Sequence, residues 1–168
     1  MFKKLLVTVD GSKTSEAILP HVVKAAGPHT RVTLLTSEMT PESHVVDVHP
    51  SVVAGSPAPG GTVTIPANRV LETTGQAIER VREEKMRYLE ALAAPLRAAG
   101  LAVETMVVFG WDAGEDIVET AKRLDVDVIF MATHGRTALG QIVFGSVAER
   151  VMHEAPCPVL LVRPAKLN

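Results

Sequence analysis

The chain is poor in cysteine, in aromatic residues and in long apolar runs. Its one cysteine, Cys157, excludes a disulfide within the chain and fits a reducing compartment, although it leaves a bridge between two chains open. Apolar runs such as Val128–Ala132 are far too short to span a bilayer, and the N-terminal stretch MFKKLLVTVDGS stops being apolar too soon for a signal peptide. We therefore predict a soluble, cytoplasmic protein.

An excess of charge of one sign is lacking too. With 17 basic and 19 acidic residues the formal net charge is −2, so there is no basic field to attract nucleic acid or an anionic membrane, and we expect neither as a partner. Apolar residues make up 46% and aromatic residues only 4%, as in α/β proteins whose strands are buried on both faces. A length of 168 residues suits one hydrophobic core, which predicts a single domain over residues 1–168.

Strand and helix patterns alternate along the chain. Alternation of this kind implies right-handed crossovers and an open parallel sheet with helices on both faces, and ligands of such sheets bind beyond the carboxyl ends of the strands. Pro20 predicts a kink or a late helix start in the first helix, and Gly100 is expected to cap the second. The predicted strands are 3–9, 31–37, 102–110, 126–132 and 157–162, and the predicted helices are 15–26, 75–100, 113–125 and 146–155.

Residues 40–73 interrupt this pattern. The stretch HPSVVAGSPAPGGTVTIP holds four prolines and three glycines, which predicts a long flexible insertion or a loosely packed hairpin. Four residues here have side chains that bind metals, but their spacing matches no defined site, and we predict no metal centre. They are Glu42, His44, Asp47 and His49.

The stretch MATHGRTALGQIVFGSVAERV, residues 131–151, has glycine spacing that is reminiscent of a phosphate-binding loop. In the Walker motif a lysine and a hydroxyl residue follow the second glycine, because the lysine neutralises phosphate and the hydroxyl holds magnesium. Gln141 and Ile142 occupy those positions here, so the motif is rejected. A G-x-G-x-x-G dinucleotide fingerprint is absent as well.

A different phosphate site remains open. Gly145 and Ser146 begin a predicted helix whose free amides and dipole attract phosphate, and Gly135 would let a second backbone segment approach the same oxygens. Ser146 and Glu149 also match a capping box. The alternative is that Gly135 serves only a turn and that Ser146 and Glu149 only cap the helix, and spacing alone does not decide between these interpretations.

The same stretch resembles the nucleotide-binding segment of the universal stress protein family. Its ATP-binding members have glycine, two residues, glycine, nine residues, then glycine and serine or threonine; here Ala132, Gly135, Gly145 and Ser146 fall on that spacing, with alanine in place of the first glycine. The resemblance continues in VTVDGS, in VDVIFMATHGR and in GSVAERVMHEAPCPVLLVRP, and covers the chain apart from the insertion.

The resemblance implies a fold and a function. The fold is a Rossmann-like domain of the adenine nucleotide α-hydrolase type, with five parallel strands in the order 3-2-1-4-5 and helices on both faces. Members bind ATP, with or without Mg²⁺, at the carboxyl ends of the strands and pair as homodimers through the last strand, here Val159–Val162. The expected protein is a dimeric stress-response regulator controlled by nucleotide, with a slow ATPase or a nucleotide-free structural dimer as alternatives.

Carried over position by position, the resemblance also names site residues. Asp10, with Val9 beside it, would approach the ribose or the base, and Ser37 would take a base-contacting position that is usually valine. The remaining residues would line the nucleotide or cradle its phosphates, mostly through backbone amides: Met131, Ala132, Gly135, Arg136, Gly145, Ser146 and Val147.

Some of these residues have plainer interpretations. Asp10 could instead turn the chain and cap the first helix, and Arg136 could be an ordinary solvated arginine. His134 lacks a nucleophile or carboxylate partner nearby in sequence, so no catalytic residue is predicted. Ala132 adds a methyl group and Ser37 adds polarity, and both departures from the family pattern are expected to weaken ATP binding without abolishing it.

Overall fold

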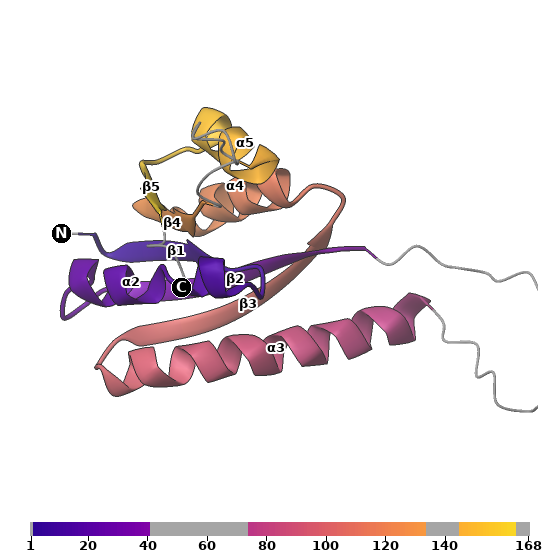
Figure 1. Cartoon of the computed structure of the whole chain (residues 1–168), viewed down its shortest axis with the longest axis horizontal. Coiled ribbons are helices and arrows are strands. Elements are labelled where there is room, and N and C mark those ends of the chain that lie inside the picture. Colours follow the sequence, from indigo (N-terminus) through magenta and orange to yellow (C-terminus); the bar gives the residue numbers. More distant parts are fainter. Residues whose placement is uncertain (1, 41–73, 134–144, 164–168) are drawn as a thin grey trace, which may run out of the picture.

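Five parallel strands form one sheet in the order β3-β2-β1-β4-β5 (Figure 1). The structure is a computed structural model that describes residues 2–40, 74–133 and 145–163. The strand order confirms the predicted fold class. The strands are β1 Lys4–Thr8, β2 Arg31–Met39, β3 Ala102–Gly110, β4 Val128–Ala132 and β5 Val159–Val162.

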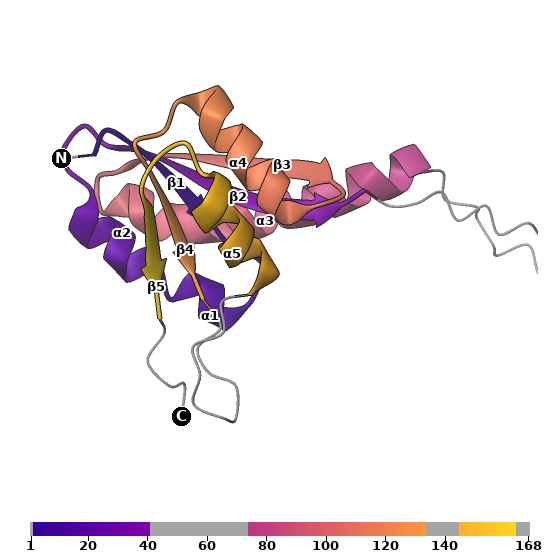
Figure 2. The same ribbon diagram turned by 90° about the horizontal axis from the view of Figure 1, so that it is seen from above.

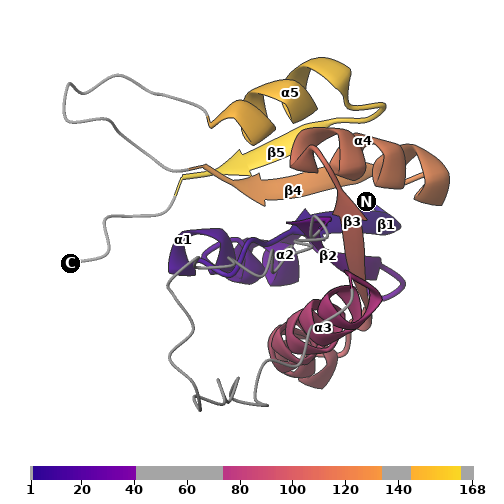
Figure 3. The same cartoon turned by 90° about the vertical axis from the view of Figure 1, so that its right-hand side faces the viewer.

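Helices cover both faces of the sheet. Figure 3 shows α4 and α5 on one side of the strands and α1, α2 and α3 on the other. Each face buries its own apolar cluster, one centred on Leu5, Leu34 and Phe130 and the other on Leu6 and Ile129, so side chains of neighbouring strand positions point to opposite layers. The helices are α1 Lys13–Glu16, α2 Leu19–Ala25, α3 Thr74–Ala98, α4 Ala113–Leu124 and α5 Ser146–Glu154.

Pro20 divides the first predicted helix in two. α1 ends at Glu16, and α2 begins at Leu19 with Pro20 in its first turn. Proline is tolerated there because the first amides of a helix have no partner within the helix. The late start that the proline predicted is confirmed, as is Gly100 after α3, where φ is +89°.

The β2 and β3 strands extend beyond the rest of the sheet. β2 was expected to end at Ser37, but it continues to Met39 because its pairing with β3 continues through Met39 and Gly110. The ends of this two-stranded extension expose large apolar side chains: Met39 is 72% exposed and Trp111 is 69% exposed. The extension arises from pairing between distant segments, which the local sequence pattern does not report.

The carboxyl ends of the strands meet at one end of the sheet, toward which the arrowheads of β4 and β5 point in Figure 2. From β1 the chain crosses to β2 on one side, whereas β4 pairs with β1 on the other. The connections that follow β1 and β4 therefore lead to opposite sides at the carboxyl ends of these two strands. Ligands of open α/β sheets bind at such a point. Among the described residues, no helix has the length and apolar character needed to cross a membrane.

Candidate functional site

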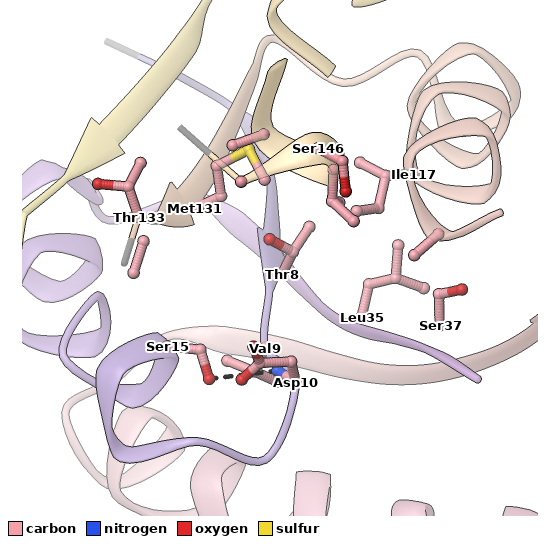
Figure 4. Close-up of a pocket in the computed structure, with 15 residues that line it drawn as sticks. Thr8, Val9, Asp10, Ser15, Leu35, Ser37, Ile117, Met131, Thr133 and Ser146 are labelled. Carbon is pink, nitrogen blue, oxygen red and sulfur yellow. Dashed lines mark hydrogen bonds between the residues drawn. The ribbon is translucent and has the colours of Figure 1, made fainter. Parts of the chain in front are cut away.

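A cavity of about 280 Å³ opens at the carboxyl ends of β1, β2 and β4 (Figure 4). Its walls come from the ends of β1, β2 and β4 and from the first turns of α4 and α5. Gly135 and Arg136, like His134, lie outside the described residues. The other predicted site residues all line this one cavity: Val9, Asp10, Ser37, Met131, Ala132, Gly145, Ser146 and Val147.

The loop after β1 is held by short-range hydrogen bonds. The Asp10 Oδ1 atom accepts a hydrogen bond from the Ser12 amide at 2.9 Å, and the Asp10 amide donates to Ser15 Oγ at 3.2 Å. Gly11 takes φ +85° in this turn. Ser12, not Asp10, caps α1, because its side chain accepts from the Ser15 amide at 3.1 Å. Asp10 therefore turns the chain but does not cap the helix. It is exposed and lines the cavity.

The first turn of α5 forms the opposite wall. The predicted capping box is wrong: Gly145, in extended conformation at φ −63° and ψ 156°, is the N-cap, and no side chain caps the helix. Ser146 is already helical, so its hydroxyl is one position too late to act as a cap. Within the described residues, the N-cap position of α5 supplies no side-chain hydrogen bond to the first amides, and Gly145 to Ala148 line the cavity.

Apolar side chains line the part of the cavity between the sheet and α4. Leu35, Ile117 and Met131 all belong to the apolar cluster beneath α4 and α5. The sequence interpretation missed Leu35 and Ile117 because each looks like an ordinary core residue of a strand or a helix. It also missed Thr8 and Thr133, which are buried at strand ends and could have been found from that position alone.

The sequence interpretation also missed Asp116 on α4. The Ser37 hydroxyl donates a hydrogen bond to Asp116 Oδ2 at 2.6 Å, and both side chains are half-buried. Ser37 lines the cavity between the strand ends, whereas Asp116 lines a neighbouring hollow beside β3. The bond therefore passes through the wall of the candidate site, at the carboxyl end of β2.

An arginine in the middle of α5 ties this helix to the first turn of α4. Arg150 is 2.9 Å from Asp112, 3.7 Å from Glu115 and 3.2 Å from Glu154. Asp112 caps α4 by accepting from the Glu115 amide at 3.0 Å, and this hydrogen bond, followed by that from Arg150, lowers the pKa of Asp112. The ionised carboxylate thus links the start of α4 to the middle of α5.

Tyr88 gives a prediction that reports on the packing of α3 against the β1 loop. Burial, followed by the charge of Glu16 and the hydrogen bond from the phenol to Glu16 at 3.4 Å, raises the pKa of Tyr88 to about 12. In an unfolded chain a tyrosine titrates near 10. The folded state therefore keeps the proton longer, and stability should fall as pH rises from about 10 toward 12.

Tyr88 is the only tyrosine, so an ultraviolet absorbance titration observes it alone. We expect an apparent pKa near 12. Replacing Glu16 by glutamine should lower this pKa, because the charge contribution is lost. The matched control is Glu84→Gln, which removes an exposed carboxylate from α3. A wild-type value near 10 would contradict the arrangement.

Cys157 and a metal site were the other candidates that the sequence raised. Burial, and after it the charge of Asp127, raises the pKa of the half-buried Cys157 thiol, which agrees with a structural cysteine. No group of three or more histidine, cysteine or acidic residues that could hold a metal ion is found within residues 2–40, 74–133 and 145–163. The four residues of the insertion whose side chains can bind metals lie outside those ranges.

Comparison with known proteins decides the family. A sequence model of the universal stress protein family matches residues 1–163. The chain belongs to this family. Universal stress protein MJ0531 of Methanocaldococcus jannaschii is 34% identical over 170 residues, an alignment that covers 99% of this chain and 85% of that protein.

Solved structures of universal stress proteins share the fold. The structure of MJ0577 from Methanocaldococcus jannaschii superimposes with a TM-score of 0.71 at 28% identity and covers 99% of each chain. Two more distant structures contain an adenine nucleotide. They are the Archaeoglobus fulgidus protein with dAMP, at TM-score 0.57, 21% identity and coverage of 95% and 96%, and an Arabidopsis thaliana family protein with AMP, at 0.59, 16%, 97% and 92%.

Proposed function

We propose that this universal stress protein binds ATP in the cavity at the carboxyl ends of β1 and β4. The observation that carries the proposal is that the predicted site residues meet in one place. Residues that the family resemblance names from four separate segments of the sequence line one cavity, including Val9, Ser37, Ala132 and Gly145. Residues with no common role would not be expected to meet at the point where a parallel sheet binds its ligands.

The cavity has one part that suits phosphate groups and another that suits a base. The first amides of α5, at Gly145 and Ser146, together with the helix dipole, suit phosphate oxygens. Leu35 and Ile117 supply apolar surface that suits a base. A Cβ added at Gly145 would meet no atom within 4 Å, so the backbone here leaves room for a phosphate group to approach. Gly135 and Arg136 are proposed to complete the phosphate cradle.

The nucleotide complexes of the more distant family members support an adenine nucleotide as the ligand class. ATP, with or without Mg²⁺, is the nucleotide we propose, as the resemblance of residues 132–146 implies. The cavity volume of about 280 Å³ lies near the lower end of the range for small-molecule sites, which suits a ligand whose phosphates extend outward along α5.

We also propose that two chains pair through β5. β5 is an edge strand, and Leu160 on it is 37% exposed, whereas its neighbour in the sheet, Phe130, is fully buried. An uncovered apolar edge strand is a liability that a symmetric partner removes. The nucleotide would then regulate the dimer by favouring one arrangement of the binding loops over another. A single domain over residues 1–168 and a cytoplasmic location remain predictions of the same kind.

One observation favours a second candidate, a nucleotide-free dimer of the same family. Ala132 lines the cavity where ATP-binding members have glycine, so its methyl group takes space that the ligand would use. Contact with one methyl group is expected to cost about 1 kcal/mol, which weakens binding by roughly fivefold to tenfold rather than preventing it. Slow ATP hydrolysis is the weaker alternative, because the sequence offers no recognised general base for it.

The test is direct. The purified protein is denatured, any released nucleotide is identified, and ATP affinity of the stripped protein is measured by calorimetry with and without magnesium. We expect micromolar affinity at one site per chain. No binding up to millimolar ATP, together with a purified protein that releases no nucleotide, would contradict the proposal and favour the nucleotide-free dimer.

A further inference from the structure

The hydrogen bond between Ser37 and Asp116 controls how one wall of the cavity can interact with a ligand. A serine hydroxyl has one hydrogen to donate and lone pairs that accept. A carboxylate can only accept, so at 2.6 Å the single hydrogen of Ser37 is directed to Asp116 Oδ2. Ser37 also lines the cavity, and toward a ligand there its oxygen can only accept hydrogen bonds, through its lone pairs.

The backbone beside Asp116 is shaped to allow this contact. Gly110, the last residue of β3, lies against the Asp116 carboxylate so closely that an added Cβ would overlap its oxygens. Any side chain at position 110 would push the carboxylate away from its present position. Ser37 pairs with Val108 in the β2–β3 ladder, so glycine two residues further along β3 and serine on β2 are placed together by the register.

The polarity of Ser37 has a consequence for recognition. A hydrogen-bond acceptor in the wall favours a ligand group that donates, such as the exocyclic amino group of adenine. It disfavours a carbonyl oxygen, such as the one that hypoxanthine carries at the same ring position, because two acceptors would face each other with no hydrogen between them. Sites built around such polar contacts discriminate strongly against analogues that cannot make them.

We propose that Asp116 is a positioning residue that orients the Ser37 hydroxyl and so makes the site select an amino-bearing base over a keto base. This inference rests on the proposed nucleotide-binding function and adds the source of its base specificity. Asp116 does not touch the ligand in this arrangement, since it lines the hollow on the other side of the wall, beside Val108 and Phe109.

The experiment compares ATP with ITP, which differ at this ring position, by calorimetry on the full chain. We expect wild type to prefer ATP by about tenfold, the effect of one hydrogen bond gained against one acceptor left unpaired. Asp116→Ala frees the hydroxyl to rotate and donate, so the ratio of affinities should fall to about two or less, chiefly because ITP binds better.

Three variants separate orientation from other effects. Glu119→Ala is the matched control, since it removes a carboxylate from the same hollow, one turn along α4, and should leave the ratio unchanged. Gly110→Ala should lower the ratio as Asp116→Ala does, because it displaces the carboxylate. In a Ser37→Ala background, Asp116→Ala should have no further effect on the ratio, since the two residues act as one unit.

Each outcome has a definite meaning. A wild-type protein that binds ATP and ITP equally, or an Asp116→Ala variant with an unchanged ratio, overturns the inference while leaving nucleotide binding intact. Additive effects in the double variant overturn it as well, because Asp116 would then act on the base independently. Failure of wild type to bind either nucleotide is a different result, which overturns the proposed function itself.

Discussion

Replacing Gly145 by tryptophan is expected to lower the affinity for ATP by about a hundredfold or more, which corresponds to about 3 kcal/mol of binding free energy. The glycine stands at the entrance to α5 and lines the cavity. An indole at this position would occupy the space in front of the helix amides, where the phosphates are proposed to lie. Calorimetry on the stripped protein measures the loss.

The same substitution should leave the fold intact. Gly145 has φ −63°, which any residue adopts, and an added Cβ meets nothing within 4 Å. The midpoint of thermal unfolding without nucleotide is therefore expected to stay close to that of wild type. Gly145→Ala is the matched control and should bind ATP within a few fold of wild type. ATP binding that survives the tryptophan would place the ligand elsewhere on the molecule.

The largest effect on stability is expected from Phe130→Ala, at about 3 to 5 kcal/mol of unfolding free energy. Phe130 is fully buried and lies on β4 between Val7 of β1 and Leu160 of β5. Truncation removes apolar surface and leaves a cavity that the flanking strands cannot close, because their register is fixed on both sides. Urea unfolding monitored by circular dichroism measures the change.

A matched control distinguishes burial from residue type. Phe2 is 37% exposed, and Phe2→Ala should cost less than about 1 kcal/mol. Where Phe130→Ala is too unstable to purify, Phe130→Leu keeps most of the volume and should still cost about 1 kcal/mol or more. A change below 1 kcal/mol for Phe130→Ala would contradict the burial of this side chain on β4, between β1 and β5.

Most of the fold could be predicted because its signals are local. Continuous apolar runs identified β1 and β4, since strands buried on both faces need no polar alternation. Pro20 and Gly100 marked helix boundaries through their own backbone constraints, which act wherever the residue stands. The family motif then implied the strand order and placed the site at the strand ends, because the position of a residue at a strand end can be read from the sequence.

Helix capping was predicted less accurately because it depends on backbone angles at single residues. The sequence around α5 fits a capping box at Ser146, yet the extended conformation of Gly145 makes that residue the cap. At α1 the sequence suggested Asp10 as a possible cap, whereas the structure has Ser12 in that role. Both alternatives use suitable residue types, so the choice is made by how the preceding strand leads into the helix, which is a property of the assembled sheet.

Individual hydrogen bonds between the side chains of distant segments could not be predicted. Ser37 and Asp116 are 79 residues apart, and Glu16 and Tyr88 are 72 apart. Each residue alone is an unremarkable polar side chain, and its partner is chosen by strand register and by the packing of a helix on the sheet. Hydrophobic periodicity depends on near neighbours and is written into the sequence, whereas a hydrogen bond across the fold exists only once the layers have been brought together.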